Sequence, residues 1–129
     1  MVKKAVCVII IAIILFGLAI TELVLVESFI IDLDNQIDNL IIEYEENKNN
    51  IIKVVPSIEK IKTKWDNAEN LLCLMFNHKD TSCLTDSITR LLAYTKNDNY
   101  EEGFVELSVL KEYSEKNTSI MGCNLDNIF

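Results

Sequence analysis

Glycine and proline are scarce in this chain, which has three glycines and one proline among its 129 residues. Turn-rich β folds need such residues at their many reversals, so their scarcity favours long helices. Arginine is almost missing too: Arg90 is the single one, and the formal net charge is −8. Binding to a phosphate backbone requires clustered lysine and arginine, so we expect no nucleic acid among the partners of this protein.

The sequence also lacks the patterns that usually carry chemistry. It has no glycine-rich loop for a phosphate and no Ser, His and Asp arranged as in a nucleophile elbow. Of the four cysteines, Cys7 lies in an apolar run, and Cys73, Cys83 and Cys123 cannot all pair within one domain. This indicates small apolar cysteines in a reducing or anaerobic setting. We therefore predict a protein that is not an enzyme and holds no cofactor.

What the chain does have is a long apolar run near its start. Residues 5–20 carry no charge, Lys3 and Lys4 precede them, and apolar residues resume at 23–26 after Thr21 and Glu22. At a rise of 1.5 Å per residue, residues 5–20 cover roughly 24 Å and the run to residue 26 about 33 Å, close to the ~30 Å hydrocarbon core of a bilayer. We predict a transmembrane helix here, marked by Ala5, Ile10, Leu15 and Ile20.

Two other interpretations of this run remain open. Two lysines before an apolar core are also typical of a cleaved signal peptide, and Gly17 with Ala19 gives a small-x-small cleavage pattern. The apolar residues that resume after Glu22 favour an uncleaved anchor over this alternative, and over the core helix of a soluble protein. Basic residues at a span end stay cytoplasmic, so Lys3 and Lys4 favour an N-terminus on the cytoplasmic side of the cell membrane, with a domain that faces the cytoplasm as the alternative. We expect an anchor over residues 1–26 and an outer-face domain over residues 27–129.

Beyond the anchor, apolar residues recur at helical spacing. Steps of four and three residues from Val26 to Tyr44 predict one rod that continues from the membrane to about residue 46. The stripe must pack on the rest of the domain or on a partner, through a seam of Val26, Ile30, Leu33 and Ile37. Further helices are expected over about 50–77, from the end of a turn at 78–82 to about 96, and from about 101 to 116, followed by a docked tail over 117–129.

Two details of this prediction depend on single residues. Pro56 either kinks the second helix or follows a short first piece of it. The tail is expected to touch the bundle through apolar side chains, namely Ile120, Met121, Leu125, Ile128 and Phe129. The predicted fold is all-α: an N-terminal transmembrane helix continues into a stalk, and a small antiparallel helical bundle follows.

Several short stretches resemble domain-of-unknown-function family 4363, small single-pass membrane proteins of anaerobic spore-forming (clostridial) bacteria. They are KWDNAENLLCLMFNHKD, a helix ending in RLLAY, a helix with FVELSVLKEY, and the ending NLDNIF. The positions that match the family pattern are Trp65, His78, Arg90, Leu91, Leu107, Leu110, Leu125, Asn127 and Phe129; Pro56 departs from it. The resemblance implies a membrane location, a helical fold and a neighbouring multi-pass membrane protein as partner, and it carries no activity.

Three side chains stand out as candidates for function: Trp65, His78 and Arg90. Trp65, with Tyr94, Tyr100 and Phe104, is expected in the core, although a ligand pocket is the alternative. His78 is the only histidine, and it suits either a cap in a turn or a proton-sensing group. Cys73, His78, Asp80 and Cys83 are zinc-ligand types, but their spacing differs from that of short chelating loops, so we predict no metal.

The acidic residues on helix surfaces also have two interpretations. Glu101, Glu102 and Glu106 fit the first turn and solvated face of a helix better than a pair of catalytic carboxylates. The stalk carboxylates are expected to form a solvated face, with cation capture near the membrane as the alternative. They are Asp32, Asp34 and Asp38.

The sequence thus predicts a non-enzymatic accessory or scaffold that contacts the lipid bilayer and binds a membrane protein or a second copy of itself. A ligand- or ion-sensing helical module at the membrane surface is the alternative. A filled bundle interior would favour the scaffold, and an apolar cavity with convergent polar groups would favour the sensor.

Overall fold

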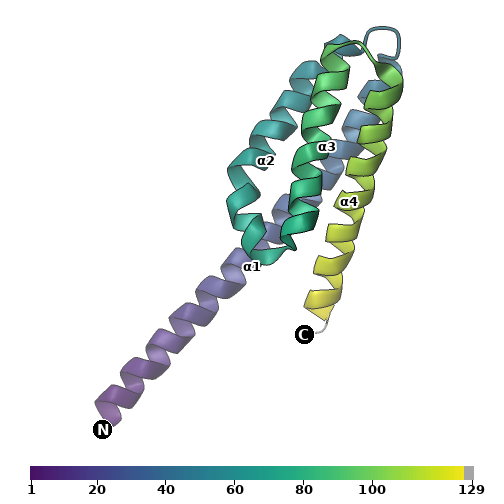
Figure 1. The fold of residues 1–129 in the computed structure, drawn as a ribbon. Coiled ribbons are helices and arrows are strands. Elements are labelled where there is room, and N and C mark those ends of the chain that lie inside the picture. The colour runs from purple at the N-terminus through teal and green to yellow at the C-terminus, as the bar shows by residue number, and fades with distance from the viewer. Residues whose placement is uncertain (127–129) are drawn as a thin grey trace.

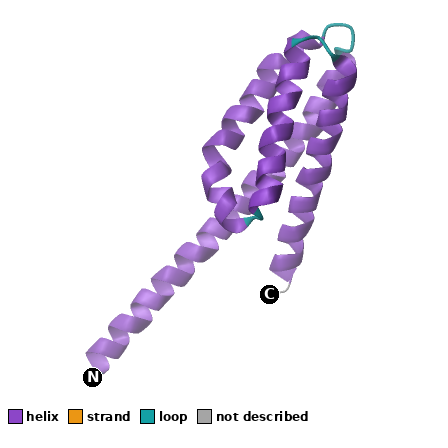
Figure 2. Cartoon of the chain, viewed as in Figure 1, coloured by secondary structure: helices purple, strands orange, loops and turns teal. Residues whose placement is uncertain are grey.

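Helices make up almost the whole of the described chain. The computed structural model describes residues 1–126, with side chains through residue 119, and this part contains no strand (Figures 1 and 2). The all-α prediction, with a long apolar N-terminal helix that runs into an antiparallel bundle, is confirmed. The elements in chain order are α1 (Val2–Glu46), the 3-10 helix η1 (Ile51–Val54), α2 (Val55–Met75), α3 (His78–Lys96) and α4 (Tyr100–Asp126).

Helix α1 has two halves with different surroundings. It runs unbroken for 45 residues, about 67 Å at the usual helical rise. Figure 1 shows its N-terminal half projecting away from the other helices and its C-terminal half lying among them. Residues 1–22 are exposed, whereas from Val26 to Tyr44 a side chain is buried at every third or fourth position. This period of burial matches the apolar stripe that predicted the rod.

The remaining helices complete an up-down-up-down bundle around that stripe. Among neighbouring helices, the contacts are most extensive between α3 and α4, followed by the α1–α4 and α2–α3 pairs, and they are fewest between α1 and α2. Connections of a few residues make each helix antiparallel to the next, as is usual in four-helix bundles (Figure 1). The bundle therefore closes on three sides and is more open between α1 and α2.

The core runs the length of the bundle and receives side chains from every element. Full burial of an apolar side chain stabilises the folded state by roughly 1.5–3 kcal/mol, so this core supplies the main driving force for folding. Its buried apolar members are Val26, Ile30, Leu33, Ile37, Leu40, Tyr44, Ile51, Val54, Ile58, Ile61, Trp65, Leu72, Leu84, Ile88, Leu91, Leu107 and Leu110.

The start of the second helix follows one of the two predicted alternatives. Residues 51–54 form a short 3-10 piece, and Pro56 then sits in the first turn of α2. The backbone N–H groups of a first turn have no partner within the helix, so proline costs nothing there. Pro56 therefore resets the helix start and does not kink it.

The predicted turn at residues 78–82 is wrong, because these residues are the first turns of α3. The reversal is made by Phe76, whose backbone is extended, and by Asn77. The Asn77 side chain accepts a hydrogen bond from the Lys79 backbone N–H at 3.0 Å, which caps the helix. The residues predicted as a turn are thus the start of α3, and Asn77, predicted as the end of the second helix, is its cap.

The predicted tail after residue 116 is also wrong in its backbone. Helix α4 continues to Asp126, since no proline interrupts residues 117–126 and the single Gly122 costs a helix only about 1 kcal/mol. The docking predicted for Ile120, Met121 and Leu125 concerns side chains outside the described part. Ile128 and Phe129 lie outside it altogether, as does Asn127.

Candidate functional site

The first feature of functional interest is the apolar half of α1. Its most apolar 18-residue window has a mean hydropathy of 2.9, and none of this window is buried against the rest of the protein. The predicted span markers Ala5, Ile10, Leu15 and Ile20 are all exposed. This helix is long and apolar enough to cross a membrane, and exposed apolar surface on this scale is what lipid, unlike water, accommodates.

The predicted seam lies inside the bundle. Val26, Ile30, Leu33 and Ile37 are at most 2% exposed, and all belong to the core. Of the two alternatives for this stripe, packing on the rest of the domain is therefore what the structure contains. Any partner must use another surface, because these four side chains are already covered by the chain itself.

Trp65 is held in the core by a chain of hydrogen bonds. It is 1% exposed, and its indole N–H donates to the Thr85 hydroxyl at 2.8 Å. Thr85 in turn lies 2.8 Å from a carboxylate oxygen of Glu69, and the ring of Phe29 is 6.4 Å from that of Trp65. Trp65 thus joins α2 to α3 and to α1. Its contacts are those of a core residue with a satisfied N–H.

His78 lies away from Trp65, at the exposed start of α3. Its Nδ1 is 3.9 Å from the Cys73 sulfur across the α2–α3 turn. Asp80 faces α4 instead, where Lys116 approaches both its carboxylate oxygens at 3.4 Å. Among the side chains that the structure describes, no group of three His, Cys, Asp or Glu residues is close enough to hold a metal ion.

Arg90 connects α3 to α4. Its Nε donates to a Glu106 carboxylate oxygen at 2.7 Å, and this hydrogen bond raises the pKa of the Arg90 guanidinium. The arginine side chain is half exposed, and pairs of this kind contribute about 0.2–1 kcal/mol to stability. Glu106 is therefore better described as an interhelical partner than as a solvated or catalytic carboxylate.

A stronger polar contact, which the sequence did not indicate, joins α1 to α4. Lys111 lies 2.9 Å from Asp34 and 2.8 Å from Asp38, and the Ser114 hydroxyl donates to Asp34 at 2.9 Å. Burial alone would lower the pKa of Lys111, but the hydrogen bonds and charges of Asp38 and Asp34 outweigh it and raise the pKa. With Asp32 paired to Lys64 of α2, the stalk carboxylates do not form a simple solvated face.

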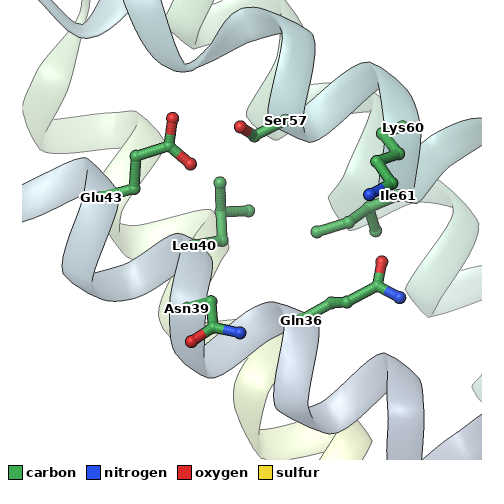
Figure 3. A pocket seen from close by; sticks show the side chains of 7 residues that line it. All are labelled: Gln36, Asn39, Leu40, Glu43, Ser57, Lys60 and Ile61. Carbon is green, nitrogen blue, oxygen red and sulfur yellow. The ribbon is translucent and has the colours of Figure 1, made fainter.

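A shallow groove lies between α1 and α2. It has a volume of about 180 Å³, and Figure 3 shows polar side chains of both helices around it. Leu40 and Ile61 are the buried apolar residues of its lining. The polar lining comes from Gln36, Asn39 and Glu43 of α1 and from Ser57 and Lys60 of α2. Such a surface can exchange hydrogen bonds and charge with a polar ligand or a partner segment.

Comparison with known proteins places the bundle in a family. Residues 24–128 match the family described as Domain of unknown function (DUF4363). The match begins near the end of the apolar run, so it covers the bundle and leaves most of the run outside. No curated protein and no solved structure matches the chain. Because the matched region is most of the sequence, the chain belongs to the DUF4363 family.

Proposed function

We propose that this protein is a single-pass membrane protein whose bundle acts as a non-enzymatic accessory or scaffold for a membrane partner. The observation that carries the proposal is the continuity of α1. One unbroken helix supplies both the exposed apolar half and the buried stripe of the bundle core. A bundle attached in this way is held close to the bilayer surface without a flexible linker, which suits a structural role.

The contacts of the candidate side chains support this role. Trp65, Arg90 and Lys111 each connect one helix to another, through polar contacts with Thr85, Glu106 and the Asp34–Asp38 pair respectively. The bundle interior is filled by apolar side chains from every element. A filled interior favours a scaffold over a module that encloses a ligand.

The orientation in the proposal follows from the basic residues before the span. Lys3 and Lys4 stand at the N-terminal end of α1, and residues of this kind remain on the cytoplasmic side. The bundle then stands on the outer face of the cell membrane. Protease added to intact cells should remove the bundle, and it should spare it if the orientation is reversed.

The partner is expected to contact the exposed surface of α1, since its bundle face is occupied. A photo-crosslinking side chain placed at Phe16, which is 68% exposed, should give one discrete adduct in native membranes, with a membrane protein or a second copy. The same side chain at Val105, exposed on α4, is the matched control and should give none. The absence of any discrete protein adduct from Phe16 and its neighbours on α1 would contradict a partner within the membrane.

The α1–α2 groove favours a second candidate, a ligand- or ion-sensing module. Five polar side chains surround this groove, including Glu43 and Lys60 with opposite charges. Under this alternative, protein isolated from native membranes carries a small molecule in native mass spectrometry, and Glu43→Ala or Lys60→Ala releases it. A mass equal to that of the chain alone would leave the scaffold as the better account.

A further inference from the structure

We propose that the bundle makes a second contact with the bilayer, through the tip where α2 turns into α3. The tip consists of Leu71, Leu74 and Met75, with the turn residue Phe76 partly buried beneath them. Leu74 is 83% exposed, and Leu71 and Met75 are about 40% exposed. Other exposed apolar residues of the bundle, such as Ile42, Ile52 and Val105, stand apart along the chain, whereas these three are gathered at one end of a helix.

The packing of α2 on α1 fixes the height of the tip. The two helices are antiparallel: Ser57 and Lys60 share the groove with Gln36 and Glu43, and further along the ring of Trp65 lies 6.4 Å from that of Phe29. Helix α2 then continues ten residues from Trp65 to Met75, about 15 Å, toward the N-terminal half of α1. Figure 1 shows the α2–α3 turn beside α1 where α1 leaves the bundle.

The membrane boundary implied by α1 falls near the height of Leu71, so Leu74 and Met75 lie on the membrane side of it. A span of about 20 residues that begins near residue 5 ends near Val24. Val24 and Leu25 are more than half exposed, Leu23 packs partly on the core, and Val26 is the first fully buried residue. Interrupted only by Thr21 and Glu22, the apolar outer surface of α1 therefore reaches the lower edge of the bundle, where the tip continues it. The exposed side chains of α1 and of the tip together form one apolar surface, and this surface fits contact with the outer leaflet of the bilayer.

The charges near the tip are also compatible with contact with the outer leaflet. Residues 70–79 include the base Lys79 and no acid, in a chain with twenty acidic residues and a net charge of −8. Apolar side chains with a flanking lysine can lie at the boundary of headgroups and acyl chains, whereas carboxylates are unfavourable there. The inference rests on the proposed membrane anchor and adds that the α2–α3 tip of the bundle also contacts the lipid.

Fluorescence quenching by lipid tests the contact in the full-length chain. The protein is reconstituted in phosphatidylcholine vesicles without bromine, with bromine near the top of the acyl chains, and with bromine near their ends, as three variants: Leu74→Trp, Val105→Trp and Phe16→Trp. The parent chain, whose Trp65 is buried above the membrane boundary, supplies the baseline. We expect a blue-shifted extra emission from Leu74→Trp that loses intensity in brominated vesicles, and no such loss for Val105→Trp.

The Phe16→Trp variant distinguishes failure of the tip contact from failure of the membrane anchor. If its emission is quenched while that of Leu74→Trp matches Val105→Trp, the anchor stands and the tip contact is overturned; another protein surface, such as a second copy, or water then covers the tip. If Phe16→Trp is not quenched either, the membrane anchor fails and the tip proposal fails with it. Leu71→Trp repeats the test at a second position of the tip and should show the same loss as Leu74→Trp.

Discussion

The hydroxyl of Tyr44 on α1 lies directly against the Cα of Gly103 on α4. A Cβ at Gly103 would overlap the Tyr44 oxygen and stand 3.0 Å from the ring carbon that bears it. The same hydroxyl is 3.3 Å from that of Thr95, and the Tyr44 ring stacks on Tyr100 at 5.4 Å between centroids. The absence of a side chain at position 103 therefore lets α4 approach α1 at the end of the bundle that lies farthest from the apolar half of α1.

Gly103→Ala should lower the free energy of unfolding. The added methyl displaces Tyr44 from its stack and its hydrogen bond, and overpacking of this kind costs about 1–3 kcal/mol, more than the gain of up to about 1 kcal/mol from a better helix former. Thermal unfolding in detergent, followed by circular dichroism, measures the loss. Gly17→Ala is the matched control, because nothing lies within 4 Å of a Cβ there, and it should not lower the melting temperature.

A double-mutant cycle shows whether Tyr44 is the obstacle. Tyr44→Phe removes the overlapping oxygen, so adding Gly103→Ala to this variant should cost less than adding it to the parent chain. Equal costs in the two backgrounds would mean that the close approach of Gly103 to Tyr44 does not govern the packing of α4.

The Lys111 cluster should contribute more to stability than an exposed ion pair. Lys111→Met leaves Asp34, which is 21% exposed, beside Asp38 one helical turn away with no cation between them. Hydrogen bonds to charged groups are worth about 1.5–3 kcal/mol when partly buried, and we expect a loss of this size in denaturant unfolding. Lys96→Met, which breaks a half-exposed pair with Glu59, is the control and should cost below about 1 kcal/mol. Similar losses for both variants would refute a special role for Lys111.

Stability should fall in alkaline solution. Burial is the main cause that raises the pKa of Tyr44, and the pKa of Lys111 is raised by Asp38 and Asp34 despite its burial. Both groups hold their protons more tightly in the folded chain, so their contribution is complete below the ordinary pKa values of about 10 and is lost as the pH rises through the folded values. Denaturant unfolding measured from neutral to strongly alkaline pH should show this decline.

Variants identify the groups responsible for the alkaline decline. Tyr44→Phe and Lys111→Met each remove one titrating group, and each should make the loss of stability with pH shallower than in the parent chain. A parent chain whose free energy of unfolding stays level or increases above pH ~10 would show that these two groups do not titrate as described.

Charges in the α1 stripe should unfold the bundle without releasing the anchor. Ile30→Asp with Ile37→Asp places two carboxylates among core side chains that are at most 2% exposed, a change that costs several kcal/mol. Circular dichroism should show loss of cooperative unfolding, while the chain remains in the membrane fraction. Ile31→Asp with Ile42→Asp, at exposed positions of the same helix, should unfold like the parent. A normally folded bundle in the first variant would contradict the core position of the stripe.

Local patterns in the sequence predicted most of the helices. The steps of three and four from Val26 to Tyr44 reflect one helix face, and burial follows them residue by residue. The predicted start of α3 is too late because Asp80, Thr81 and Ser82 suit a turn as well as the first turns of a helix. The predicted end of α4 is too early: residues 117–126, predicted as a docked tail, contain no proline and continue the helix.

Contacts between segments that are distant in the chain could not be predicted from the sequence. Asp34 and Lys111 are 77 residues apart, and each looks like an ordinary surface charge until α4 is laid against α1. Gly103 likewise has the appearance of a helix weakness, and only the position of Tyr44 explains it. Trp65 was expected in the core, but its hydrogen bond to Thr85 depends on how α2 packs on α3.

The most direct test of the whole account is where the intact chain is found. Cells that express the full sequence are broken without detergent, and membranes are washed at alkaline pH to strip peripheral proteins before the mass of the chain is measured. The N-terminal half of α1 is apolar and is not buried by the rest of the protein. It should therefore keep the uncleaved chain in the membrane pellet until detergent is added. Recovery of the uncleaved chain in the soluble fraction, or of a chain shortened after the apolar run, would contradict it.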